Sequence, residues 1–165
     1  MTNIYLSKAT CDYFEFETVK DISPEAAIWH WNAHVFELAG YRHLLLMEEQ
    51  SLYSVVVFKI EPDFKLCINS FVVKAANQLK TDRFSQAQID RFIELQDHTL
   101  AYPVPFKGRE MTMINHMIGK LKKVYLDTNN PAEMKLFSET VLNRTPWKTL
   151  GFKTPVERLE KQLSR

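Results

Sequence analysis

The segment from residue 28 to residue 58 constrains the fold more than any other part of the chain. Its runs WHWNAHVFEL and RHLLLM are rich in β-forming residues and flank Ala39-Gly40, and a third run, LYSVVVF, follows the polar residues 48–51. β-Branched and aromatic residues favour extended strands, and a short turn containing glycine connects antiparallel neighbours. We therefore predict an antiparallel β-meander over about residues 29–60.

The first of these runs has an alternative interpretation as a helix. Ser23-Pro24-Glu25 is a typical helix start, and a helix continuing through residue 38 would place His30, His34 and Glu37 on one face, at a spacing that can bind a metal ion. In a strand, His30 and His34 lie about 13 Å apart, which is too far for them to share one ion. The Ala39-Gly40 turn favours the strand, so we predict no metal site.

Alternation along this strand divides its side chains between two faces. One face carries Trp29, Trp31, Ala33 and Val35, and the other carries His30, Asn32, His34, Phe36 and Leu38. The two tryptophans are either core residues or an aromatic surface that contacts a partner. The His/Asn face is either half of a covered sheet surface or an acid–base site.

The remainder of the chain predicts helices that pack on one face of the sheet. Helical signals cover residues 65–79 (where strand character is an alternative), 85–95, 110–126, 131–142 and 154–163, and residues 98–107, with Pro103 and Pro105, read as an extended connection. The helix over 110–126 has an apolar stripe, formed by Met111, Ile114, Ile118, Leu121 and Tyr125. We predict an α+β fold with a single domain over residues 1–165.

Composition excludes several classes of function. No apolar run approaches the roughly 18–20 residues of a membrane span, and the N-terminal residues do not resemble a secretory leader, so we expect a cytoplasmic protein. We expect the two cysteines, Cys11 and Cys67, to be reduced thiols. None of the four glycines belongs to a phosphate-binding loop, and no cofactor is expected.

The charge distribution suggests a macromolecular partner. Residues 1–100 contain 9 Lys and Arg against 14 Asp and Glu, giving −5, whereas residues 101–165 contain 12 against 6, giving +6. A basic C-terminal third can face nucleic acid or an acidic protein, or it can simply keep helical surfaces soluble. The candidate contact residues are Arg109, Lys120, Lys123, Arg144 and Lys148, with Trp29 and Trp31 as a second surface.

Two resemblances add to this interpretation. Trp29-His30, Asn32, Phe36, Arg42, Leu44 to Leu46 and Ser51 to Val55 resemble the strand motifs of a small bacterial family of unknown function, which implies an α+β fold and no known chemistry. The segment LNRTPWKTLGFKTPVERL resembles the end of integrase-type transposase domains, through Asn143, Arg144, Pro146, Leu150, Gly151, Thr154, Pro155 and Glu157. We identify no carboxylate triad of the kind those enzymes use to hold metals.

Two functions from different classes follow. The first is a non-enzymatic binding or regulatory accessory protein that acts through a protein or nucleic-acid partner. The second is a small hydrolase or nuclease that uses His30, Asn32 and His34. Because the sequence contains no compact catalytic motif, we favour the first.

Overall fold

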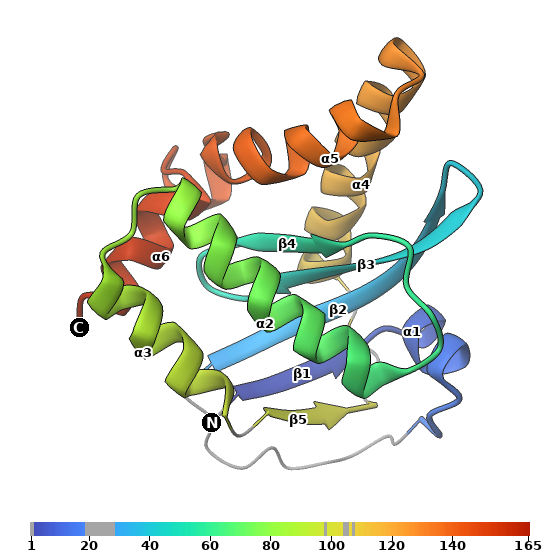
Figure 1. The fold of residues 1–165 in the computed structure, drawn as a ribbon, viewed down its shortest axis with the longest axis horizontal. Coiled ribbons are helices and arrows are strands. Elements are labelled where there is room, and N and C mark those ends of the chain that lie inside the picture. The colour runs from blue at the N-terminus through green and yellow to red at the C-terminus, as the bar shows by residue number, and fades with distance from the viewer. Residues whose placement is uncertain (1, 19–28, 98, 104–105, 107) are drawn as a thin grey trace.

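The computed structural model contains a five-stranded mixed sheet with helices on both of its faces (Figure 1). It describes residues 2–18, 29–97, 99–103, 106 and 108–165. The strand order is β4-β3-β2-β1-β5, where β1 (Thr2–Leu6) lies parallel to β2 (Trp29–Leu38) and to β5 (Thr99–Tyr102). The α+β class predicted from the sequence is confirmed. The helix-start signal at residues 23–25 lies outside the described residues.

The predicted meander forms the antiparallel half of the sheet. Strand β2 pairs with β3 (Tyr41–Glu48), and β3 pairs with β4 (Ser54–Val57). Ala39 and Gly40 connect β2 to β3, and both have positive φ values, 55° and 78°. This is the conformation of a type I′ turn, whose twist matches that of the strands it connects. The strand interpretation of residues 29–38 is therefore confirmed over the helical alternative.

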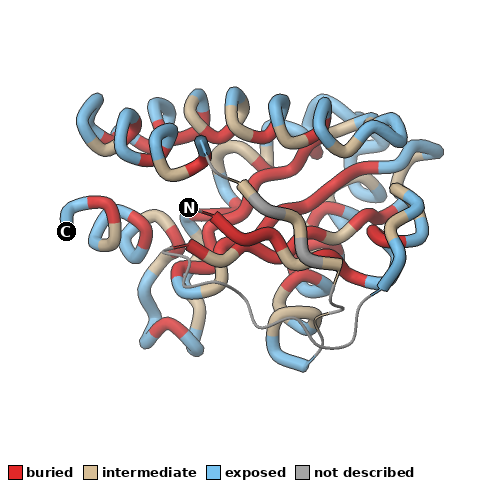
Figure 2. The backbone as a smooth tube through the Cα atoms, turned by 90° about the horizontal axis from the view of Figure 1, so that it is seen from below, coloured by how far each residue is buried: buried red, intermediate tan, exposed pale blue. Residues whose placement is uncertain are grey.

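Helices cover both faces of the sheet, so the prediction of a single covered face is wrong. The core on one face includes α2 (Phe64–Thr81), α3 (Gln86–Gln96) and α6 (Pro155–Leu163), and the core on the other includes α4 (Arg109–Thr128) and α5 (Pro131–Thr140). The strands are buried between these layers (Figure 2). The reason is visible in β3, where residues 44–47 are four consecutive apolar side chains, all fully buried. A strand buried on both faces loses its polar alternation.

Three helices, α3, α5 and α6, begin where their capping residues predict. Ser85 and Thr154 each form a complete capping box, with Gln88 and Glu157 respectively, and Asn130 caps α5 with Pro131 at its first position. The short helix α1 (Lys8–Phe14) follows β1, and Ser7 is its N-cap. Two 3-10 turns, η1 (Leu142–Arg144) and η2 (Lys148–Leu150), connect α5 to α6.

Candidate functional site: a basic stripe on α4

The outer face of α4 carries a row of basic side chains. Its inner face contributes Ile114, Met117, Ile118 and Leu121 to the core. We use the name basic stripe for Arg109, His116, Lys120 and Lys123, which are separated by seven, four and three residues and so share the outer face. At 1.5 Å per residue the stripe extends over about 21 Å. Asp127, one turn further on, marks its end.

A shallow groove of about 560 Å³ follows the stripe. It is lined by Thr112, Asn115, His116, Gly119, Lys120 and Lys123, which together supply hydrogen-bond donors and positive charge. Elsewhere, Lys8, Arg42, Lys74 and Arg144 each pair with a carboxylate. Among the described residues, no carboxylate forms an ion pair with the cations of the stripe. These charges are therefore available to a partner.

Trp147 fixes the middle of the basic stripe. The Lys120 Nζ atom lies 4.7 Å from the centroid of the Trp147 ring, and the His116 ring meets the same indole edge-on at 6.1 Å. Partial burial lowers the pKa of Lys120. Trp147 is held in turn by hydrogen bonds between its backbone and the backbones of Lys153 and Phe152, at 3.1 and 2.9 Å. Lys148, the residue that follows Trp147 in the chain, is exposed.

Arg144 has a structural role apart from the stripe. Its guanidinium group lies 3.1 Å from Asp82, whose side chain is only 1% exposed, and it also donates to the Thr81 carbonyl oxygen. The Tyr53 hydroxyl donates to the same carboxylate at 2.7 Å. Burial raises the pKa of Asp82, and the hydrogen bonds that Tyr53 and Arg144 donate to its carboxylate counteract the rise. Of the five basic residues predicted to contact a partner, Arg144 is thus the one with a carboxylate partner among the described residues.

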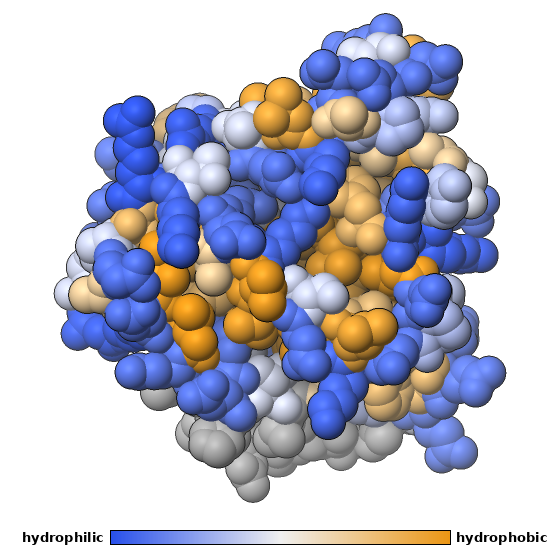
Figure 3. Space-filling model, viewed as in Figure 1, coloured by the Kyte–Doolittle hydropathy of each residue, from blue (hydrophilic) through white to orange (hydrophobic). Residues whose placement is uncertain are grey.

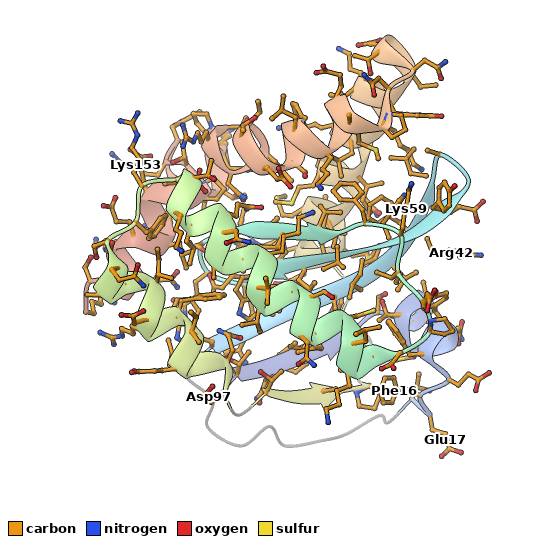
Figure 4. All side chains as sticks on the ribbon, in the orientation of Figure 1. Phe16, Glu17, Arg42, Lys59, Asp97 and Lys153 are labelled. Carbon is orange, nitrogen blue, oxygen red and sulfur yellow. The ribbon has the colours of Figure 1, made fainter. Side chains whose placement is uncertain are left out.

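Arg42 and Lys59 are also engaged by neighbouring residues, beside the β2–β3 turn (Figure 4). Arg42 pairs across the hairpin with Glu37 at 3.4 Å, and Lys59 lies 4.5 Å from the Tyr41 ring. They do not extend the basic stripe, which belongs to α4.

Trp29 and Trp31 belong to the core. They are 4% and 0% exposed, and the Trp31 ring packs edge-on against Phe71 of α2 and Phe92 of α3, with centroids 4.9 and 6.2 Å away. Their burial supports the structural interpretation over the aromatic surface. The choice between the two depended on whether helices cover this face of β2, and the sequence of β2 alone does not show this.

His30, Asn32 and His34 face the opposite side of β2. His30 and His34 contact side chains of the N-terminal segment, and Asn32 is buried opposite Tyr5 in the β1–β2 register. The Tyr5 hydroxyl lies 3.3 Å from His30 Nδ1, and the two rings stack at 5.8 Å. The Ser7 Oγ atom lies 2.8 Å from His34 Nδ1, and burial lowers the pKa of His34, which favours the neutral imidazole. Over the described part of the chain, no group of three or more His, Cys, Asp or Glu is arranged to hold a metal ion.

The Ser7–His34 pair has the distance of a nucleophile and its base, yet its surroundings favour a structural role. Ser7 is 3% exposed, accepts a hydrogen bond from the Thr10 backbone as the cap of α1, and lies 2.8 Å from the Thr10 hydroxyl. Its oxygen is thereby committed to the fold. Ser7 was not among the predicted site residues because β1 was not predicted from the sequence. The available signal was Ser7 as a capping residue after the short run NIYL.

The fold and this surface define an α+β protein with a two-sided mixed sheet and an outward basic helix. A family model described as a domain of unknown function, DUF6933, matches residues 3–158, and the chain belongs to this family. No curated protein matches the chain. The likeness of the C-terminal segment to integrase-type transposase domains remains a resemblance. No described helix has both the length and the apolar character needed to cross a membrane.

Proposed function

We propose that this chain is a non-enzymatic binding protein that uses the basic stripe of α4 to contact nucleic acid. One observation carries the proposal, namely that Arg109, Lys120 and Lys123 lie in one row without carboxylate partners among the described residues. Unpaired cations on a rigid helix gain most from a partner with closely spaced negative charges. A nucleic-acid backbone is such a partner.

The groove along the stripe favours nucleic acid over an acidic protein surface. It offers Thr112, Asn115 and His116 as hydrogen-bonding groups between the cations, and phosphate oxygens accept bonds from side chains of this kind. Trp147 holds Lys120 in place, so less side-chain entropy is lost when the ammonium group meets a phosphate.

Binding of a fluorescent oligonucleotide tests the proposal. Single-stranded and duplex probes are titrated with the protein at several salt concentrations between about 50 and 200 mM, a range in which phosphate contacts weaken strongly. The triple variant Arg109→Gln, Lys120→Gln, Lys123→Gln is expected to bind at least about tenfold more weakly at low salt. Its plot of log affinity against log salt should be shallower by about two to three, since each lost phosphate contact removes about 0.9 from the slope.

The matched control removes the same number of charges from the opposite side of the molecule. Lys65, Lys80 and Arg91 are exposed on α2 and α3, and their joint replacement by glutamine should leave the affinity nearly unchanged. Equal affinities of the two triple variants would overturn the assignment to α4. If the wild-type protein binds poly-glutamate and no oligonucleotide, the partner is an acidic protein and the nucleic-acid proposal is wrong.

A further inference from the structure

A second hollow lies on another side of the molecule, between α2 and α5. It measures about 740 Å³, within the size range of small-molecule sites. Figure 3 shows this side, where apolar and polar surfaces alternate over the two helices. The residues that line the hollow are Asn69, Ser70, Val73, Lys74, Asn77, Gln78, Thr81, Lys135, Leu136, Glu139 and Thr140.

Lys74 is the principal charged group of this hollow. Its side chain is 20% exposed, its Nζ atom lies 4.5 Å from the centroid of the Phe58 ring, and Glu139 is 3.6 Å away. Burial lowers the pKa of Lys74 to about 8. Lys135 lines the same hollow, so two cations face one carboxylate. This balance leaves one positive charge for a ligand to neutralise.

Gln78 adds a buried hydrogen-bond acceptor one helical turn from Lys74. It is 3% exposed, and its Nε2 atom donates to the Ser54 carbonyl oxygen at 3.0 Å, which fixes the orientation of the amide. The Oε1 atom is buried without a hydrogen-bond partner among the described residues. An unmatched buried acceptor costs free energy, which a ligand with an N–H or O–H group would recover.

We infer that the hollow between α2 and α5 binds a small organic acid, whose carboxylate meets Lys74 and Lys135 and whose N–H or O–H group donates to Gln78 Oε1. Lys74 and Gln78 are four residues apart on α2, so the two functions of the ligand are separated by about one helical turn. The exposed side chains of Val73 and Leu136 offer apolar contact to the body of the ligand. This site is separate from the basic stripe, and neither depends on the other.

The test uses benzoate and 4-hydroxybenzoate, which share a carboxylate and differ by one hydroxyl donor. Each is titrated into isotopically labelled protein at pH 7, below the pKa of Lys74, and followed by the NMR signals of the backbone amides. We expect both to shift amides of α2 and α5 within residues 69–81 and 135–140, and 4-hydroxybenzoate to bind at least about threefold more tightly, as a single added hydrogen bond allows. Lys74→Met should weaken both by about tenfold or more.

Two further variants make the result specific. Lys80→Met changes an exposed lysine of the same helix that does not line the hollow, and it should bind both acids as the wild type does. Gln78→Met should retain binding and abolish the difference between the two acids, with the spectrum itself reporting that the fold is intact. The inference is overturned if neither acid shifts amides of α2 and α5, or if Lys74→Met binds them unchanged.

Discussion

Ala39, in the turn between β2 and β3, has a backbone conformation that alanine disfavours. Its φ of 55° lies in the left-handed region, where the Cβ atom of alanine is crowded and asparagine is tolerated better. Ala39→Asn should therefore raise the free energy of unfolding by about 0.5–1 kcal/mol, because Asn-Gly is a preferred type I′ pair. Urea denaturation measures this change, and Ala39→Val should change stability in the opposite direction, since a β-branched residue fits this region poorly.

At the scale of elements, the segment between α5 and α6 covers the β4 edge of the sheet. Strand β4 is an edge strand, and the buried Asn143 side chain pairs with it as a neighbouring strand would. Its Oδ1 atom accepts from the Ser54 backbone N–H at 2.7 Å, and its Nδ2 atom donates to the Ser54 carbonyl oxygen at 2.7 Å. Asn143, one of the eight residues on which the C-terminal resemblance rests, thus has a structural role.

Replacement of Asn143 by alanine should cost about 2–3 kcal/mol of stability, because it leaves the buried Ser54 N–H without its acceptor. Thermal and urea unfolding measure this loss. Asn69→Ala, at an exposed asparagine of α2, is the matched control and should change stability by less than about 0.5 kcal/mol. Equal stability of the two variants would show that Asn143 does not support the edge of β4.

Elements with a local signal were predictable from the sequence, and those formed by distant pairing were not. The capping boxes at Ser85 and Thr154 and the Ala39-Gly40 turn depend on neighbouring residues, and the structure confirms all three. Strands β1 and β5 have only five and four residues, and both form by parallel pairing with no connecting turn between neighbours. Such pairing leaves little trace in a short sequence window.

At the scale of the whole molecule, the candidate site also combines features with a local sequence signal and features that depend on distant residues. The apolar stripe predicted within residues 111–125 leaves Lys120 and Lys123 on the outer face of the helix, and the groove along α4 is lined by both. The role of Arg144 depends on Asp82, which is 62 residues away in the sequence. The burial of the tryptophans likewise depends on helices elsewhere in the chain. The sequence therefore indicated the outer face of one helix, but not the partners that other elements bring.

Lys74 affects the stability of the whole molecule through its proton. Its pKa is lowered in the fold from 10.5 to about 8, so the folded protein loses this proton before the unfolded chain does. Between about pH 8 and pH 10.5 the unfolded state binds more protons, and the contribution of Lys74 to the free energy of unfolding rises with pH by at most about 1.4 kcal/mol per unit. Below about pH 8 Lys74 is charged in the folded protein, and the burial of this charge lowers the free energy of unfolding by its full amount.

Lys74→Met should therefore be more stable than the wild type at pH 7, and this advantage should shrink as the pH rises to 10. The difference between the two proteins is the quantity to measure, by urea unfolding at several pH values. The free energy of unfolding of the wild type also depends on Cys67, whose pKa is raised by burial to about 11. The unfolded chain loses this proton first, so the contribution of Cys67 lowers stability as the pH rises above 9. Lys80→Met, at an exposed position on the same helix, should follow the wild-type curve. A Lys74→Met advantage that stays constant from pH 7 to pH 10 would mean that Lys74 titrates as an exposed lysine does, with its charge outside the hollow between α2 and α5.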